Sequence, residues 1–166
     1  MASQNKCPRD IKIRKMIMED IPAVIEIDRV TDADPWTESI FRRELQLPVS
    51  HTLVATHQQG SEVRIAGFIT FWIVADELQL HKIAVIRQVQ RCGIGKRLFQ
   101  AMTALALAHG VFRATLEVRC TNDAAISLYE TFGYQVSAVR KGYYGATGED
   151  ALMMSVNLRP DSYLKH

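Results

Sequence analysis

The chain has 166 residues, of which 48% are hydrophobic and 23% are charged, and its formal net charge at pH 7 is +2. This length and composition predict one globular domain with its own core and exclude extensive disorder. So small a positive charge, without a basic run, argues against a nucleic-acid partner. No apolar stretch approaches the roughly 20 residues that a membrane-spanning helix needs.

The first half of the chain predicts a strand, two helices and three further strands. Their spans, in chain order, are 11–16, 18–30, 36–47, 52–56, 63–74 and 77–85. Thr37 is the expected N-cap of the second helix, whose buried face is expected to carry Ile40, Phe41 and Leu45. A turn is expected at 57–61.

The second half predicts two helices, a strand and a closing β-hairpin. Their spans are a helix to about His109, a strand at 114–118, a helix at 122–132 and hairpin strands at 134–139 and 151–156 around the loop 142–150. Gly110 and Gly133 are the expected helix C-caps. This order predicts an α/β fold in which a mixed sheet of about six or seven strands is flanked by about four helices. We expect one domain at 11–158, with tails at 1–10 and 159–166.

The six residues Gln90-Arg91-Cys92-Gly93-Ile94-Gly95 stand between a predicted strand and a predicted helix. Glycines at such a junction let the backbone approach a ligand, and the first turn of the helix presents N–H groups that suit a phosphate. Arg91, Lys96 and Arg97 add positive charge. A dinucleotide fingerprint requires glycine where Leu98 stands, and a Walker loop requires glycine at Gln90 and Ser or Thr at Arg97. An ordinary glycine-containing turn is the alternative interpretation.

The cysteines and histidines predict no metal or disulfide chemistry. Cys7, Cys92 and Cys120 are scattered and form neither a disulfide framework nor a metal-ligand cluster, which favours a reducing cytoplasm. The five histidines show no metal spacing. The opening residues contain no apolar segment of the secretory type, so we expect a cytoplasmic protein.

Three side chains after the glycine loop are candidates for ligand binding or acid–base chemistry. Glu117 lies on the strand that follows the loop helix, and the alternative is an exposed carboxylate paired with Arg119 on the same face. Asn122 and Tyr129 are seven residues apart, so on a helix both point to one side. Their alternatives are a helix cap and a half-buried core aromatic.

The runs 116–119, 122–130 and 132–134 resemble the RimI-type N-terminal acetyltransferases within the GNAT acyltransferase family, and so does Gln-x-x-Gly-x-Gly at 90–95. The segments 34–38, 143–144 and 149–154 resemble the same family, and the match is collinear from about Ile11 to Leu158. The resemblance implies a GNAT fold and transfer of acetyl from acetyl-CoA to a protein N-terminal amine. The implied acceptor is the N-terminal alanine of ribosomal protein S18.

The resemblance also implies a role for each matching residue. Main-chain groups of Ile83, Ala84 and Val85 are implied to hold the pantetheine arm and polarise the thioester carbonyl. The pyrophosphate is implied to lie on Gln90, Arg91, Cys92, Gly93, Ile94, Gly95 and Lys96. Asn122 is implied to bind the coenzyme, Glu117 to act as general base and Tyr129 to protonate the thiolate. Neither Cys92 nor Cys120 matches a family nucleophile, so direct transfer in a ternary complex is expected.

Some features depart from the family or remain open. The turn 86–89 lacks the usual Asp-Pro and aromatic, and Cys92 stands at a position that is usually polar or basic. Trp36, Glu38, Tyr143 and Tyr144 are implied to line the acceptor side, with core packing as the alternative. The alternative functions are acetylation of a small amine or a lysine side chain, and a non-catalytic acyl-CoA-binding module. No metal, membrane or nucleic acid is expected to take part.

Overall fold

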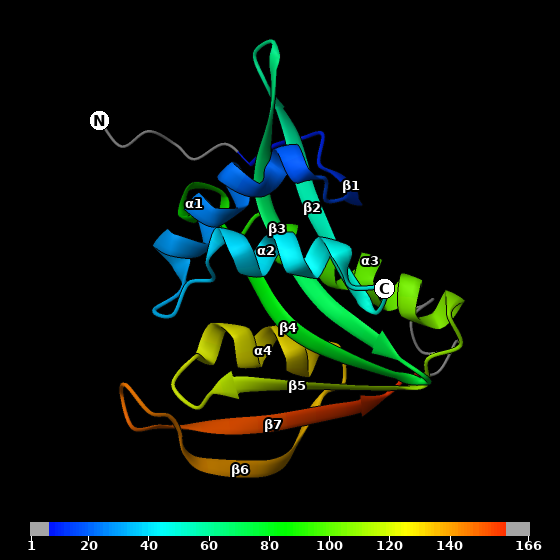
Figure 1. Cartoon of the computed structure of the whole chain (residues 1–166), viewed down its shortest axis with the longest axis vertical. Coiled ribbons are helices and arrows are strands. Elements are labelled where there is room, and N and C mark those ends of the chain that lie inside the picture. Colours follow the sequence, from blue (N-terminus) through cyan, green and yellow to red (C-terminus); the bar gives the residue numbers. More distant parts are fainter. Residues whose placement is uncertain (1–6, 159–166) are drawn as a thin grey trace. The chain divides into compact units, whose positions relative to one another are not determined.

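The structure is a computed structural model that describes residues 7–158, so residues 1–6 of the tail predicted at 1–10, and the tail predicted at 159–166, lie outside the described residues. Within that range, seven strands form a mixed sheet in the order β1-β2-β3-β4-β5-β7-β6, accompanied by four α-helices (Figure 1), which confirms the predicted fold class. The strands are β1 Lys12–Lys15, β2 Ser50–Gln59, β3 Glu62–Val74, β4 Glu77–Val85, β5 Arg113–Arg119, β6 Gln135–Tyr144 and β7 Glu149–Asn157. The helices are α1 Ile21–Thr31, α2 Glu38–Gln46, α3 Ile94–Ala108 and α4 Asp123–Thr131, with short 3-10 helices η1 Met18–Asp20 and η2 Arg87–Val89.

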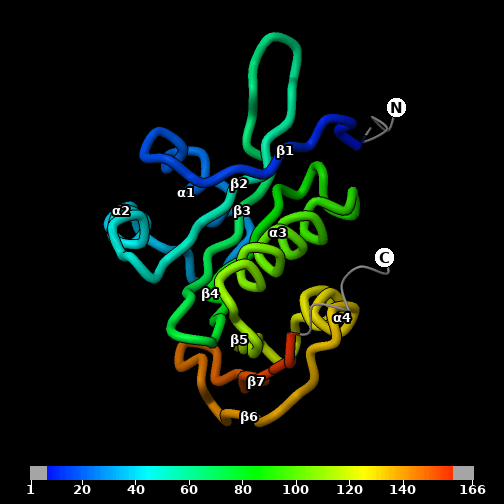
Figure 2. Tube along the Cα trace, turned by 90° about the vertical axis from the view of Figure 1, so that its right-hand side faces the viewer, coloured from blue at the N-terminus to red at the C-terminus, as the bar shows by residue number. Residues whose placement is uncertain are grey.

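The chain divides into two compact units, and the first holds the described residues up to Trp72 together with Lys82–Ala104. Its strands β1, β2 and β3 pair antiparallel, with a register shift between Ala55 and Thr56. Helices α1 and α2 cover one face of these strands, and α3 covers the other (Figure 2). The two helices, the strands and α3 therefore form three layers in this unit.

The buried face of the second helix differs from the prediction at Ile40. Thr37 caps it as expected and accepts a hydrogen bond from the Ile40 N–H. The Ile40 side chain, however, is 37% exposed, whereas Glu44 is only 5% exposed. The Glu44 carboxylate accepts hydrogen bonds from Ser50 Oγ at 2.6 Å and Trp72 Nε1 at 2.7 Å. Partners from β2 and β3 therefore satisfy a charge that helical periodicity places on the buried face, three residues from Phe41.

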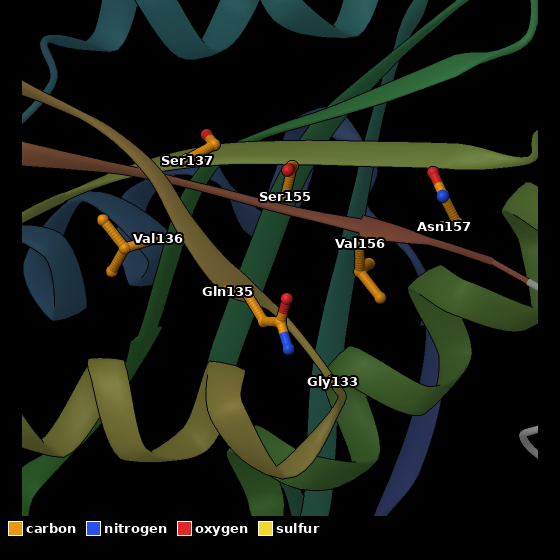
Figure 3. Close-up of a pocket in the computed structure, with 7 residues that line it drawn as sticks. All are labelled: Gly133, Gln135, Val136, Ser137, Ser155, Val156 and Asn157. Atoms are coloured by element: carbon orange, nitrogen blue, oxygen red, sulfur yellow. The ribbon is translucent and has the colours of Figure 1, made fainter.

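The second unit holds Ile73–His81 and the described residues from Leu105 onward. In it β5 pairs antiparallel with β7, and β7 with the edge strand β6, whose residues are almost all exposed. The hairpin strands are longer than predicted, and only 145–148 remain outside them. A polar hollow of about 330 Å³ lies where β6 begins and β7 ends (Figure 3).

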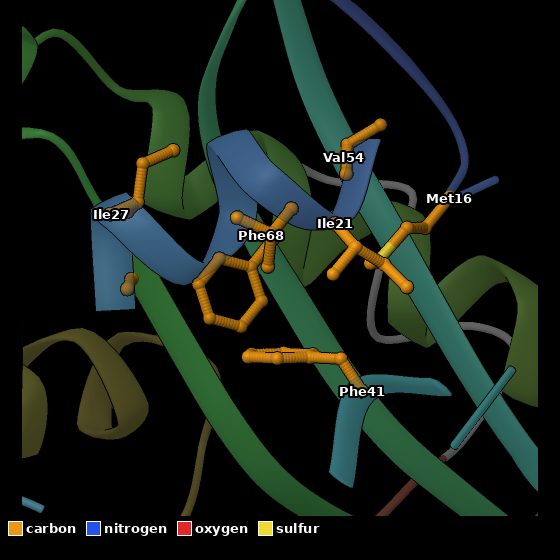
Figure 4. Close-up of a cluster of buried hydrophobic side chains, with 8 residues drawn as sticks. Met16, Ile21, Ile27, Phe41, Val54 and Phe68 are labelled. Carbon is orange, nitrogen blue, oxygen red and sulfur yellow. The ribbon is translucent and has the colours of Figure 1, made fainter. Parts of the chain in front are cut away.

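A buried hydrophobic cluster in the first unit joins α1, α2, β2 and β3 (Figure 4). The Phe41 and Phe68 rings meet edge to face with centroids 5.6 Å apart, a favoured aromatic geometry. The cluster consists of Met16, Ile21, Val24, Ile27, Phe41, Val54, Phe68 and Ala84. Because Ala84 belongs to it, the end of β4 is anchored in this core.

A buried carboxylate closes the turn that leads into α1. Asp20 accepts hydrogen bonds from Arg14 Nη1 at 2.6 Å and Nη2 at 2.8 Å, and from the Ile17 N–H at 2.9 Å. Burial raises the pKa of the Asp20 carboxyl, but the bonds from Arg14 and Ile17 outweigh it, so the net pKa is lowered. The ionised form of Asp20 is therefore the one that holds this turn together.

The prediction of unpaired cysteines is wrong for two of the three. Cys7 and Cys92 form a disulfide across a sequence separation of 85, with Cα atoms 5.4 Å apart. Spacing alone does not reveal such a pair, because the fold brings the two segments together. The cysteines therefore no longer support a reducing compartment. Cys120 is free and exposed.

In the part of the chain that the structure describes, no helix is both long enough and apolar enough to cross a membrane.

Candidate functional site

The end of β4 presents the main chain that was predicted to hold a pantetheine arm. Parallel pairing of β4 with β5 runs from Glu77↔Arg113 to Leu80↔Leu116, and Ile83–Val85 follow this paired part. On the β3 side, a Cβ atom built on Gly67 would lie 2.6 Å from the Ala84 carbonyl oxygen. Glycine at position 67 therefore allows an approach of β3 to β4 that no other residue would permit.

The glycine loop has the backbone geometry of an anion site. Arg91 and Gly93 both adopt positive φ, at 63° and 77°. Positive φ is uncommon for a residue other than glycine, and in Arg91 it marks a constrained turn. The first α-helical bond of α3 runs from the Arg97 N–H to the Gly93 carbonyl at 3.0 Å, so the N–H groups of residues 94–96 precede it at the positive end of the helix.

Some polar side chains around the loop are bonded to the main chain of the protein, and others are exposed and could bind a ligand. Gln90 Nε2 donates to the Val85 carbonyl at 2.9 Å and so ties the loop to the end of β4. Arg97 Nη1 donates to the Ile11 carbonyl at 3.2 Å. Arg91 and Lys96 are exposed. Exposed cations beside a helix N-terminus suit a polyanion such as a pyrophosphate.

Glu117 lies on β5 with its side chain half-buried, but it does not pair with Arg119. Arg140 Nη1 of β6 lies 3.5 Å from Glu117 Oε1, and the Arg140 guanidinium carbon lies 5.6 Å from the centre of the Tyr143 ring. Interaction with Glu117, together with burial, raises the pKa of Tyr143, while Arg140 lowers it. Two residues of the edge strand therefore face the carboxylate that was predicted to be the base.

Tyr129 and Asn122 both lie on or beside α4. The Tyr129 side chain is 5% exposed, and burial, followed by the nearby Tyr144, raises the pKa of its phenol well above the ordinary value. The increase arises chiefly from desolvation of the charged form. Asn122 Oδ1 accepts a hydrogen bond from the Ala125 N–H at 3.2 Å and so caps the helix.

A buried charge network, which the sequence analysis missed, lies beside this stretch of β4. Lys82 Nζ donates to both carboxylate oxygens of Asp28, at 2.9 and 3.0 Å, and to Asp32 at 2.9 Å. It also donates to the Asp34 carbonyl at 3.2 Å, and it lies 5.2 Å from the centre of the Trp36 ring. A lysine on the apolar face of an alternating strand is the available sequence signal.

The residues predicted for the acceptor side have local packing partners. Trp36 packs against Phe41 with ring centroids 5.4 Å apart. Glu38 forms a surface ion pair with Arg42 at 2.7 Å, four residues along α2. Trp36 therefore packs against the hydrophobic core, as the alternative interpretation expected.

Neither hollow described in the protein is lined by a predicted site residue. The polar hollow on β6 and β7 contains Gln135, Ser155 and Asn157 (Figure 3). A larger groove of about 1100 Å³ in the first unit lies along α1 and the β2–β3 turn and reaches Ile86 and Val89. Among the described residues, no group of three or more His, Cys, Asp and Glu side chains is arranged to hold a metal ion.

Comparison with known proteins gives a consistent family. Residues 21–134 match the model of the acetyltransferase (GNAT) family. A putative [ribosomal protein bS18]-alanine N-acetyltransferase of Bacillus subtilis is 37% identical over 147 residues, which cover 88% of this chain and 95% of the relative. The crystal structure of the ribosomal-protein-S18-alanine N-acetyltransferase from Escherichia coli superposes with a TM-score of 0.79 at 30% identity, covering 92% of this chain and 98% of that one.

A more distant structure shares the fold alone. Arabidopsis thaliana NAA60, solved in complex with acetyl-CoA, is 18% identical with a TM-score of 0.79, over 90% of this chain and 99% of that one. The family model and the curated relative each cover most of the chain. The chain belongs to the GNAT family of acetyltransferases.

Proposed function

We propose that this protein transfers the acetyl group of acetyl-CoA to the N-terminal amine of a protein, namely the N-terminal alanine of ribosomal protein S18, in the cytoplasm. The observation that carries the proposal is the similarity, over nearly the whole chain, to proteins named for this reaction. Such a reaction requires a base for the amine and an acid for the thiolate, and we assign these roles to Glu117 and Tyr129. We also propose that residues 11–158 act as one acetyltransferase domain.

The coenzyme fits the residues that are present around the glycine loop. Positive φ at Arg91 and Gly93 and the N-terminus of α3 support binding of the pyrophosphate by Gln90–Lys96. Main-chain groups of Ile83–Val85 bind the pantetheine arm, and the amide of Asn122, whose oxygen caps α4, still has N–H groups to donate. When bound, acetyl-CoA supplies the acetyl group as a thioester.

The chain's own residues then move two protons. Glu117 accepts a proton from the acceptor ammonium, the amine nitrogen forms the new bond to the acetyl carbon, and the carbon–sulfur bond breaks. The nitrogen loses its second proton as the amide forms, and this proton restores the phenol that has protonated the thiolate. Tyr129 donates its proton to the departing thiolate. Its raised pKa keeps the phenol protonated through the physiological range, so the acid is always loaded. Cys92 is joined to Cys7, which supports direct transfer rather than an acyl-cysteine.

A single carboxylate base deprotonates an α-ammonium group more easily than a lysine ammonium group. An α-amino group titrates at about 7.7–8.0 and a lysine at about 10.4, a difference worth about 3–4 kcal/mol of neutral amine. Glu117 therefore has the smaller task with a protein N-terminus as the acceptor.

Intact-mass detection of acetylation tests the proposal. Purified protein and acetyl-CoA are incubated with an S18 N-terminal peptide, unrelated N-terminal peptides, the same peptides with blocked α-amines and free lysines, and polyamines. One acetyl group on free α-amines only, with preference for the S18 peptide, is the expected result. Acetylation of blocked peptides or polyamines would move the function to side-chain or small-amine acetylation. Coenzyme binding without any turnover would identify a binding module.

A further inference from the structure

A single arginine connects β5 to the turn between β6 and β7. Arg119 Nη1 donates to Glu149 Oε2 at 3.1 Å and to Thr147 Oγ1 at 3.2 Å. The Arg119 guanidinium carbon lies 3.8 Å from the centre of the Tyr144 ring. Thr121 Oγ1 donates to the other oxygen of Glu149 at 3.2 Å. Ionic, polar and ring contacts from β5 therefore converge on one short turn.

These contacts are partly shielded from water, and they include a charge-assisted hydrogen bond, which is stronger than one between neutral groups. The Arg119 side chain is 21% exposed, and that of Glu149 is 30% exposed. A guanidinium can donate to a carboxylate and stack on an aromatic ring at the same time, which an ammonium does poorly. Pairing with Glu149 also neutralises a positive charge that lies on the same face of β5 as Glu117, two residues away.

The end of β6, just before this turn, carries two adjacent tyrosines, Tyr143 and Tyr144, that lie near both proposed catalytic side chains. Arg140 Nη1 lies 3.5 Å from Glu117 Oε1, and the Arg140 guanidinium carbon lies 5.6 Å from the centre of the Tyr143 ring. Tyr144 is close enough to Tyr129 to contribute to the raised pKa of its phenol. The two rings meet edge to face with centroids 5.1 Å apart. A displacement of Tyr144 would therefore also displace Tyr143.

We propose that Arg119 is a positioning residue for the acceptor amine: by holding Tyr144 and Glu149 it fixes the tyrosine pair against Glu117. Arg119 acts through Tyr144 and does not touch the reacting atoms. The inference rests on the proposed function, since it assumes that the amine is deprotonated at Glu117. We call the contacts of Arg119 with Tyr144, Thr147 and Glu149 the clamp. The proposal predicts that the clamp affects binding of the acceptor more than binding of the coenzyme.

Three variants separate the contributions of Arg119. Arg119→Met removes both the ion pair and the ring contact, and Arg119→Lys keeps a cation beside Glu149 but loses the planar contact with Tyr144. Arg113→Met is the matched control, because Arg113 lies on the same strand and face, is exposed, and pairs with Glu77 at 3.4 Å. Tyr144→Leu, alone and combined with Arg119→Met, tests whether the arginine acts through the ring.

The kinetic readout is acetylation of a free α-amine peptide. Arg119→Met should raise the peptide KM about tenfold, with less effect on kcat and less than about a twofold change in the coenzyme Kd. Arg119→Lys should recover only part of the loss, and Arg113→Met should match the wild type. The double variant should be no worse than Tyr144→Leu. Losses that multiply in the double variant, or equal losses in Arg119→Met and Arg113→Met, would overturn the proposal.

Amide hydrogen exchange measured by mass spectrometry separates this inference from the proposed function. Arg119→Met should increase exchange over 140–150 and leave the rest of β5 unchanged, whereas Arg113→Met should not alter the turn. This result is expected whether or not the wild type acetylates an α-amine, so an inactive wild type would refute only the proposed function. Unchanged exchange over the turn in Arg119→Met would refute the clamp.

Discussion

The buried network around Lys82 supports a quantitative stability prediction. Asp28 is 0% exposed, and the Lys82 side chain is 7% exposed. Lys82→Met removes the ammonium and leaves the Asp28 carboxylate buried. Its remaining hydrogen bond is then the one from the main-chain N–H of Trp36, at 2.7 Å. Removal of one partner from a buried ion pair costs about 3–5 kcal/mol. Asp32 is 34% exposed and contributes about 0–1 kcal/mol, because water replaces its lost partner.

Urea denaturation followed by tryptophan fluorescence measures this loss. Trp36 and Trp72 both belong to the first unit and report on it. The variant should lose about 3–5 kcal/mol of unfolding free energy, equivalent to about 6–20 °C in Tm for a chain of this size. Arg64→Met is the control, since Arg64 forms an exposed pair with Glu62, whose loss should cost at most about 1 kcal/mol.

A second variant distinguishes an unpaired charge from lost packing. Asp28→Asn combined with Lys82→Met removes both charges and keeps an oxygen for the Trp36 N–H. If the cost arises from the orphaned carboxylate, this double variant should recover at least half of the stability lost in Lys82→Met. A loss of less than about 1 kcal/mol in Lys82→Met, or a double variant less stable than the single one, would refute the reasoning.

The other predictions concern the proposed acid and base, one buried carboxylate and the disulfide. Glu117→Gln should lower the rate most at low pH, where the amine needs a base; full activity from pH 6 to 9 would contradict that role. Tyr129→Phe should lower kcat by about 10²-fold or more with little change in coenzyme Kd. Because burial raises the pKa of Tyr129, the phenol stays protonated and the loss should be equal across pH 6–9; a loss confined to alkaline pH, or a large rise in Kd, would contradict it. Asp20→Asn should cost about 1–3 kcal/mol at pH 7. The folded-state pKa of Asp20 is lowered, so its contribution is present above about pH 4 and disappears as pH falls through the folded-state value; urea titrations at pH 7 and pH 3 should show the variant's deficit shrink in acid, and a constant deficit would refute the account. Reduction of the disulfide, or Cys7→Ser, should lower stability by about 2–5 kcal/mol in thermal unfolding; the serine variant should be insensitive to reductant, and a wild type insensitive to reductant would contradict the linkage.

Local signals in the sequence predicted much of the fold. The Thr37 cap depends on contacts within one helical turn, and positive φ at Gly110 and Gly133 follows from glycine at a helix end, so these were predictable. The bounds of β4 match the prediction, because its alternation is regular. Strand lengths in both hairpins were underestimated, because pairing across the sheet extends strands into polar residues.

The unpredicted features depend on partners that are distant in sequence. Glu44 is buried because Trp72 and Ser50 reach it, and Glu117 faces Arg140 rather than its neighbour Arg119. Helical or strand periodicity states which face a residue occupies, but not which residue from another strand will face it. The roles of Glu117, Asn122 and Tyr129 remain predictions from the family resemblance.

The disulfide gives the chain a mechanical property. With Cys7 joined to Cys92, the segment between them is a closed ring that contains β1 through β4. A molecule pulled from its two ends can then extend only the residues outside the ring. Reduction releases 85 residues of hidden length, about 300 Å of extended chain. Single-molecule extension would therefore distinguish the two redox forms by length, and a nick at the β2–β3 turn would leave the oxidised protein in one piece.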